Sequence, residues 1–253
     1  MRSLSVSELL KVWEQGVSQS QVQQALMLLT AAAPEIPPKQ LAELSIGQRD
    51  ALLLTLREWT FGSQLSSVAT CLGCGDRLDL SFNVADIRVA PATELTETFS
   101  LSVADYEVQF RLPNSLDLVA ITSQMSPSGD AAHNSAATTQ QALLERCLLA
   151  ASSHGEEQLI TQLPSNVIGA VVERMAEADP QADVQLALSC PACSHQWQST
   201  FDIVSFFWSE INAWAYRILR EVHILASAYG WREADILAMS PYRRQLYLEM
   251  VSK

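Results

Sequence analysis

The sequence lacks the features of a membrane-spanning or secreted protein. No stretch approaches the ~18 uninterrupted apolar residues that a membrane-spanning helix needs. The N-terminal segment MRSLSVSELLKVWEQ has neither an apolar central region nor a small-residue cleavage site, so it does not resemble a secretory signal peptide. We therefore expect a cytoplasmic protein with no membrane contact and no structural disulfides.

Positive charge is also scarce. The 253 residues include 16 Lys and Arg against 28 Asp and Glu, which gives a net charge of −12. A chain this acidic repels phosphate backbones, so nucleic acid is disfavoured as a partner, whereas a basic protein surface would suit it. Hydrophobic residues make up 48% of the chain, which excludes a disordered polypeptide and allows a sizeable core.

Recognisable catalytic motifs are missing as well. The chain has no identifiable Ser/His/Asp grouping, no glycine-rich loop of the kind that cradles phosphates and no H-E-x-x-H sequence. We therefore expect no enzymatic activity and no small-molecule substrate.

What the sequence does have is two widely separated C-x-x-C pairs, Cys71/Cys74 and Cys190/Cys193. Each pair lies between runs in which apolar residues alternate, the pattern of a β-hairpin with the two cysteines at its tip. Two such tips that face each other would supply four thiolates in a tetrahedron with no open position. The spacing predicts a structural zinc ion, with iron in the same cage as the rival.

The remaining cysteine and the histidine beside the second pair are expected to play no part as ligands. Cys147 lies in an apolar pattern typical of a helix, which predicts a small buried side chain. His195 could replace a cysteine ligand, but four cysteines are already present, so we expect it beside the metal centre or exposed to solvent.

These patterns predict an α+β fold, with a mostly helical body, a split zinc ribbon of four cysteines and an inserted subdomain. The expected divisions are helices over 1–62, the ribbon over 63–90 and 181–202, an inserted α/β subdomain over 91–180, and a long helix followed by a helical hairpin over 203–253. Within the insertion we expect strands over 98–111, a mobile loop near 125–139 and helices over 116–123, 140–151 and 165–177.

Outside the insertion, Ser5, Ser18 and Ser45 are expected to cap helices, with Gln48 completing a capping box.

The expected helix over 203–229 carries apolar residues every seven positions and many aromatic residues. The simplest interpretation is a core helix. The alternative is that this helix and the segments after it dock on another protein, with candidate binding residues Trp208, Trp214, Trp231, Tyr242, Arg243 and Arg244. The basic residues among them could instead lie on a solvated helix face, or contact DNA through a helix-turn-helix.

Three stretches carry a resemblance to a known family: SIGQRDALLLTLREWTFGS at 45–63, the segment 175–198 with SCPACSHQW, and the segment 201–251 with YGW and SPYRR. Together they resemble the T4-family baseplate hub assembly chaperones, phage-type baseplate proteins of contractile tails and injection systems.

This resemblance implies a non-enzymatic assembly factor or minor structural component that binds hub or spike proteins of a contractile tail. Both a transient chaperone and a permanent part of the particle fit it, as do a phage and a bacterial injection system. A zinc-ribbon regulator that binds nucleic acid is the alternative function, and an enzyme is a third.

Overall fold

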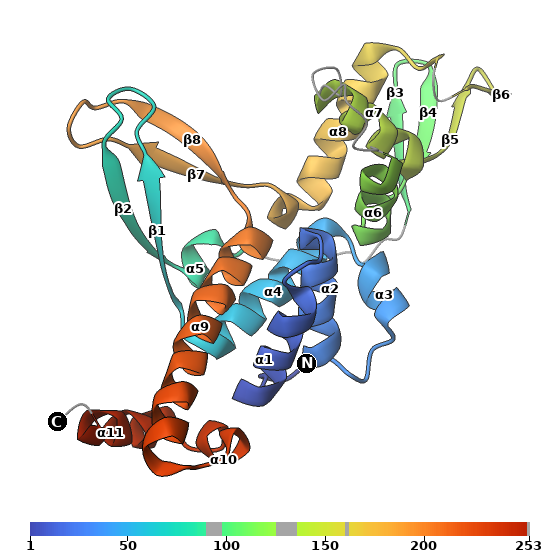
Figure 1. Ribbon diagram of the computed structural model, residues 1–253. Helices are drawn as coiled ribbons and strands as arrows, with labels where there is room; N and C mark the ends of the chain where they lie inside the picture. The colour runs from blue at the N-terminus through green and yellow to red at the C-terminus, as the bar shows by residue number, and fades with distance from the viewer. Residues whose placement is uncertain (90–97, 125–135, 160–161, 252–253) are drawn as a thin grey trace.

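A computed structural model describes residues 1–89, 98–124, 136–159 and 162–251, and it shows three parts (Figure 1). A helical body contains both ends of the described chain. Two β-hairpins, which we call the ribbon, extend from one side of it, and the inserted subdomain lies on the other side. Helix predominates and the strands form only small sheets, so the predicted α+β class is confirmed.

The body is built from helices of the N-terminal third, one short helix after the first hairpin and the C-terminal segment. They are α1 (Val6–Gly16), α2 (Gln21–Ala32), α3 (Pro38–Glu43), α4 (Ile46–Phe61), α5 (Val84–Ile87), α9 (Ile203–Tyr229), α10 (Glu233–Leu237) and α11 (Pro241–Val251).

Three of these helices begin at a serine whose side chain accepts a hydrogen bond from the third helical N–H. The caps are Ser5 for α1, Ser20 for α2 and Ser45 for α4, and in each case a Glu or Gln side chain returns a bond to the serine N–H. Each such box satisfies two backbone donors that would otherwise lack partners. The prediction for Ser45 with Gln48 is confirmed, whereas the cap of α2 is Ser20 rather than Ser18.

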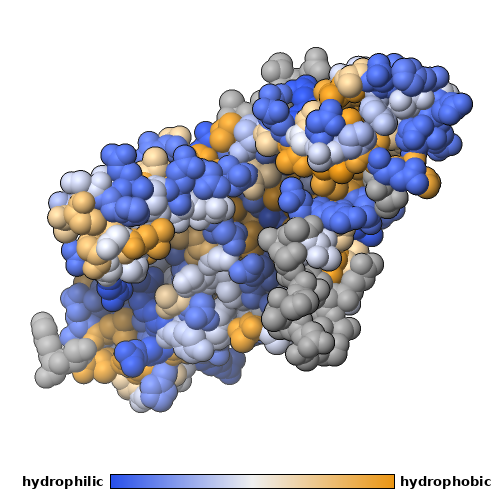
Figure 2. Space-filling model, turned by 90° about the horizontal axis from the view of Figure 1, so that it is seen from above, coloured by the Kyte–Doolittle hydropathy of each residue, from blue (hydrophilic) through white to orange (hydrophobic). Residues whose placement is uncertain are grey.

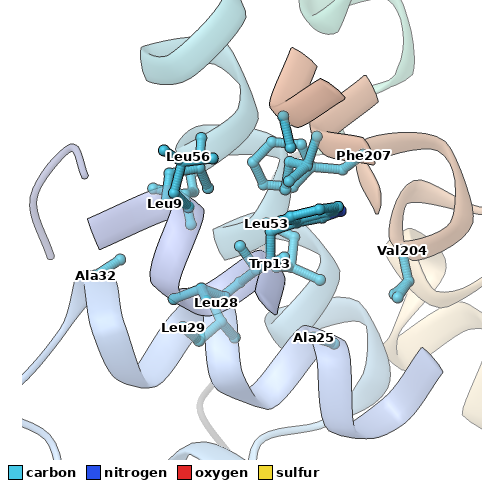
Figure 3. Close-up of a cluster of buried hydrophobic side chains, with 14 of the residues drawn as sticks. Leu9, Trp13, Ala25, Leu28, Leu29, Ala32, Leu53, Leu56, Val204 and Phe207 are labelled. Carbon is cyan, nitrogen blue, oxygen red and sulfur yellow. The ribbon is translucent and has the colours of Figure 1, made fainter. Parts of the chain in front are cut away.

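The core of the body lies where α1, α2, α4 and α9 meet (Figure 3). Leu28 and Leu29 of α2, Leu53 of α4 and Phe207 of α9 are each at most 1% exposed. Burial of one such side chain contributes roughly 1.5–3 kcal/mol, so this cluster holds the four helices together.

The seven-residue repeat of α9 faces this core. Val204, Ile211, Ile218 and Leu225 are all buried, as the core interpretation of this helix requires. Gly230 ends the helix in the left-handed conformation, with φ of 68°. Its N–H donates to the carbonyl of Ala226, so the last turn is closed before the chain reverses.

The ribbon consists of two separate two-stranded antiparallel sheets, formed by β1 (Gln64–Thr70) with β2 (Arg77–Asn83) and by β7 (Val184–Ser189) with β8 (Gln196–Phe201). Phe82 of the first hairpin and Phe201 of the second meet edge to face, with ring centroids 5.7 Å apart. The aromatic contact therefore joins the hairpins near the body, at the end opposite their tips.

The inserted subdomain has its own sheet and its own core. Its strands pair in the order β3-β4-β5-β6, and its elements are β3 (Phe99–Val103), β4 (Tyr106–Phe110), α6 (Ser115–Gln124), α7 (Ala136–Cys147), β5 (Leu148–Ser153), β6 (Glu156–Glu157), α8 (Ser165–Ala178) and the 3-10 turn η2 (Pro180–Ala182). Seen from above, this subdomain is the lobe at the upper right of Figure 2, with mainly hydrophilic side chains at its tip.

Two predictions within the insertion need correction. The expected mobile loop near 125–139 falls largely outside the described residues, but its last four residues begin α7, so that part of the prediction is wrong. The helix expected over 140–151 ends at Cys147, and the following residues form β5. β5 pairs with β4 and buries Leu148 and Ala151, so sheet pairing overrides the helical preference of leucine and alanine.

A polar junction attaches the insertion to the body near the start of α4. The N–H of Gly47 donates to the carboxylate of Asp179 at 2.8 Å. The side chain of Gln181 accepts from the N–H of Val89 and donates to the carbonyl of Ile87, and Ser45 forms a β-bridge with Asn114. Hydrogen bonds are directional, so this network helps to fix the orientation of the insertion on the body.

None of the helices in the described parts of the chain is both long enough and apolar enough to cross a membrane.

Candidate metal centre

The tips of the two hairpins have the same backbone geometry. In the first tip the N–H of Cys71 donates to the carbonyl of Asp76, and in the second the N–H of Cys190 donates to the carbonyl of His195. One residue in each tip has a left-handed backbone, Gly75 with φ of 80° and Ser194 with φ of 58°. The two C-x-x-C segments are therefore structural repeats, each closed by a tight turn after its second cysteine.

The four predicted ligands come together in space. Their sulfur atoms all lie within 4.8 Å of one another. Two sulfur contacts join different hairpins: Cys71 to Cys193 at 3.6 Å and Cys74 to Cys190 at 3.6 Å, across sequence separations of 122 and 116 residues. A tetrahedron with zinc–sulfur bonds of about 2.3 Å has sulfur–sulfur distances of about 3.8 Å, so the cluster has the dimensions of a zinc site.

The cysteines are free thiols, since a disulfide would bring two sulfurs to about 2.05 Å. Cys71 and Cys190 are buried, while Cys74 and Cys193 are exposed at the tip. The N–H of Gly73 points at the sulfur of Cys71 at 3.3 Å, a contact that stabilises a thiolate.

The ionisation of the thiols shows why a cation suits this cluster. Burial acts to raise the pKa of Cys71, but N–H groups of Cys74 and Gly73 outweigh it and lower that pKa to about 6. At Cys74 the N–H of Asp76 acts to lower the pKa, but partial loss of hydration within the cluster and the neighbouring thiols raise it to about 12. Once one thiol is ionised, its negative charge disfavours ionisation of the neighbouring thiols. Four thiolates in one cluster therefore need a bound cation to offset their charge.

The four cysteines would occupy every ligand position of a tetrahedral metal centre. Four cysteines complete a tetrahedral shell, and within the described residues no other group of three or more Cys, His, Asp or Glu side chains has ligand spacing. His195 is exposed and stacks on Trp197 with ring centroids 5.7 Å apart. A metal ion bound by all four thiolates would have no open position for a substrate or an activated water.

The predicted partner-binding residues do not form one patch. The ring of Trp208 lies against Gly16 of α1, where an added Cβ would meet a ring carbon at 2.3 Å, and Trp214 lies 6.5 Å from Phe61. Trp231 stacks on Tyr229 at 4.4 Å. Each of these tryptophans is half-buried and packs against its own chain.

The three consecutive residues at the start of α11, Tyr242, Arg243 and Arg244, differ in their exposure to solvent. Tyr242 is 76% exposed, and Arg243 is exposed with its guanidinium 5.8 Å from the ring centre of Tyr247. Arg244 is only 3% exposed and donates to Glu221 of α9 at 3.1 Å. Arg244 therefore does not lie on a solvated helix face, one of the alternatives that the sequence allowed, because its side chain bonds α11 to α9.

The candidate binding residues did not include four exposed side chains of α9: Tyr216, Arg217, Arg220 and His223. The signal was present, because these positions lie opposite the heptad seam and must face away from the core.

The chain was compared with known protein families, curated proteins and solved structures. A family model described as "T4 bacteriophage base plate protein" matches residues 6–208, which run from α1 through both hairpins and the insertion to the start of α9. No curated protein and no solved structure matches the chain.

Proposed function

The chain belongs to the family of T4 bacteriophage base plate proteins, and from this premise we propose that it is a non-enzymatic assembly factor or minor structural component of a baseplate hub. Membership of the family points to a structural or assembly role in a phage tail. The finer proposal is that the chain binds hub or spike proteins of a phage-like contractile injection system.

The observation that carries the structural part of this proposal is the cluster of four cysteines. It joins two hairpins that leave the body separately, one before and one after the insertion. The hairpins are two-stranded sheets, which are marginally stable alone. A structural zinc ion would hold their tips together and so fix a multi-lobed surface for protein partners.

Zinc is the proposed occupant because four thiolates in a tetrahedron suit it and because a structural role needs no redox change. Iron would fit the same ligands. Elemental analysis of the purified protein separates the two, since the proposal expects one zinc per chain and an iron-loaded protein would contradict it.

The role at the hub is tested by native mass spectrometry of the chain co-expressed with hub and spike proteins, before and after treatment with a strong chelator. We expect a complex with one zinc per chain, and loss of both the zinc and the hub partner on chelation. A metal-free chain that still binds the hub would contradict the proposed role of zinc. A zinc-loaded chain that binds no hub or spike protein would contradict the proposed partner.

Mass spectrometry of finished tail particles then separates the two roles. A permanent component is present in the particle, whereas a chaperone is absent from it. Nucleic-acid binding is not proposed, because the chain carries a net charge of −12 and one of its few clustered basic residues, Arg244, is buried.

A further inference from the structure

The outer face of α9 carries an exposed group of aromatic and basic side chains. Tyr216 and Arg217 are neighbours, and Arg220 and His223 follow at steps of three residues, which places all four on the side of the helix away from the buried seam. We call these four residues the basic face. In Figure 1 this part of α9 runs down from α5 towards α10 and α11.

The basic face contrasts with the charge of the chain. In the described part of the protein neither Arg217 nor Arg220 has an ion-pair partner. The two glutamates of α9 are already engaged, Glu210 with Arg57 and Glu221 with Arg244. Two guanidinium groups on this face are therefore free to pair with carboxylates, in a chain whose net charge is −12.

The aromatic member of the face is held in place by the body. Tyr216 is 63% exposed, yet its ring meets the ring of Trp13 edge to face at 5.6 Å. The indole N–H of Trp13 donates to the side chain of Asn212, one turn before Tyr216 on α9. A tyrosine fixed in this way loses little conformational entropy when it is covered, which favours binding.

Tyrosine and arginine are the residue types that most often dominate protein–protein interfaces. Because both arginines lack internal partners, the complementary surface must supply carboxylates, and it must offer an apolar contact for Tyr216. Duplex DNA would also supply negative charge, but its outer surface presents phosphates and no apolar side chains for Tyr216.

We propose that the basic face binds an acidic helix of another protein of the tail, with Arg217 and Arg220 on its carboxylates and Tyr216 against its apolar side chains. The proposal rests on the proposed function for the identity of the partner as a tail protein. All four residues lie beyond residue 208, where the match to the family model ends, so the face is a feature of this chain beyond the matched region.

The test uses the full-length zinc-loaded chain and a fluorescein-labelled helical peptide built from Glu, Leu and Ala, followed by fluorescence anisotropy. The reference probes are the same peptide with Gln in place of Glu, and a labelled DNA duplex. We expect saturable binding of the Glu peptide that weakens as salt is raised, and at least tenfold weaker binding of the Gln peptide and of the duplex.

The variant R217Q/R220Q should bind the Glu peptide at least tenfold more weakly than the unchanged chain. The matched control is R77Q/R174Q, which removes two exposed arginines from the ribbon and from α8 and should bind like the unchanged chain. Circular dichroism and zinc content identify any variant that has not folded.

Absence of saturable binding to the Glu peptide, equal binding of the Gln peptide, tighter binding of the duplex, or an equal loss in the control variant would each overturn the proposal. Because no tail protein enters this experiment, its failure leaves co-purification with the hub untouched, and the two proposals fail separately.

Discussion

Arg57 of α4 and Glu210 of α9 form a two-pronged ion pair across a sequence separation of 153 residues. Nε of Arg57 lies 2.8 Å from one carboxylate oxygen and Nη2 lies 2.6 Å from the other. The third nitrogen donates to the carbonyl of Gly62 at 2.7 Å, just after the end of α4. Arg57 is 2% exposed, whereas the side chain of Glu210 is 27% exposed, so the two partners depend on the pair to different degrees.

This asymmetry predicts unequal costs for removing each partner. Glu210→Gln leaves a buried guanidinium without its counter-charge, and we expect it to lower the free energy of unfolding by about 3 kcal/mol. Arg57→Met leaves a glutamate that water can reach, so its cost should be smaller. Urea unfolding of both variants measures the difference, and a larger loss in Arg57→Met would contradict the interpretation.

The hairpin tips offer a matched pair of substitutions. Gly75→Ala places a side chain on a left-handed backbone with no atom near enough to clash, so it should cost about 1 kcal/mol through conformation alone. Ser194→Gly relieves the same conformation in the second tip and should be neutral or slightly stabilising. Thermal unfolding of the zinc-loaded protein compares the stability of the two variants. An equal loss of stability in both would contradict the prediction that the left-handed backbone of Ser194 is costly.

Removal of one ligand should empty the metal centre. In Cys190→Ser we expect the bound zinc to fall from one per chain to a small fraction, with increased proteolysis of the ribbon, because binding and local folding are coupled. Cys147→Ala is the control, since this buried cysteine belongs to the core of the insertion. Elemental analysis of the two variants gives the result, and a full zinc complement in Cys190→Ser would exclude the four-cysteine site.

Gly47 is predicted to be essential for the junction between body and insertion. A Cβ at this position would lie 2.0 Å from a carboxylate oxygen of Asp179, so Gly47→Ala must displace Asp179. We expect a loss of about 2 kcal/mol in the free energy of unfolding and faster hydrogen exchange at Val89, whose N–H bonds to Gln181.

The control for this junction is Gly169→Ala in α8, where no atom lies within 4 Å of an added Cβ. Because alanine favours helix over glycine, this variant should be neutral or more stable by up to about 1 kcal/mol. A junction unaffected by Gly47→Ala would mean that Asp179 can move without cost.

Asp50 predicts an unusual dependence of stability on pH. Burial raises its pKa to about 6, although the neighbouring Arg49 opposes the rise. The folded chain therefore holds this proton more tightly than the unfolded chain, whose carboxyl has a pKa near 3.8. The contribution of Asp50 to stability must fall as pH rises from about 4 through 6.

Unfolding of the unchanged chain and of Asp50→Asn in urea at pH 5 and pH 7 tests this sign. The free energy of unfolding of the unchanged chain, relative to that of Asp50→Asn, should be larger at pH 5 than at pH 7. Only the unchanged chain has the carboxyl that is protonated at pH 5. A shift in the opposite direction would mean that Arg49 outweighs burial.

The sequence by itself determined the local elements. A serine followed three residues later by Glu or Gln satisfies the first amides of a helix from side chains nearby in the chain, so the start of α4 at Ser45 could be predicted. The apolar residues at every seventh position and the terminal Gly230 are also local signals, so the extent of α9 could be predicted from the sequence. The C-x-x-C spacing identified the ligands, because two thiolates on one tight turn are already half of a tetrahedral site.

Only the tertiary structure decided what each element meets. Leu148 to Ala151 carry helix-forming residues, but the open edge of β4 offers hydrogen bonds that a helix there would leave unmade. Arg243 and Arg244 are adjacent and alike in sequence, yet the 100° step of a helix turns one towards solvent and the other towards Glu221. Pairing across more than a hundred residues, as between Cys74 and Cys190, depends on how the lobes are arranged, and that arrangement arises from the packing of the whole chain.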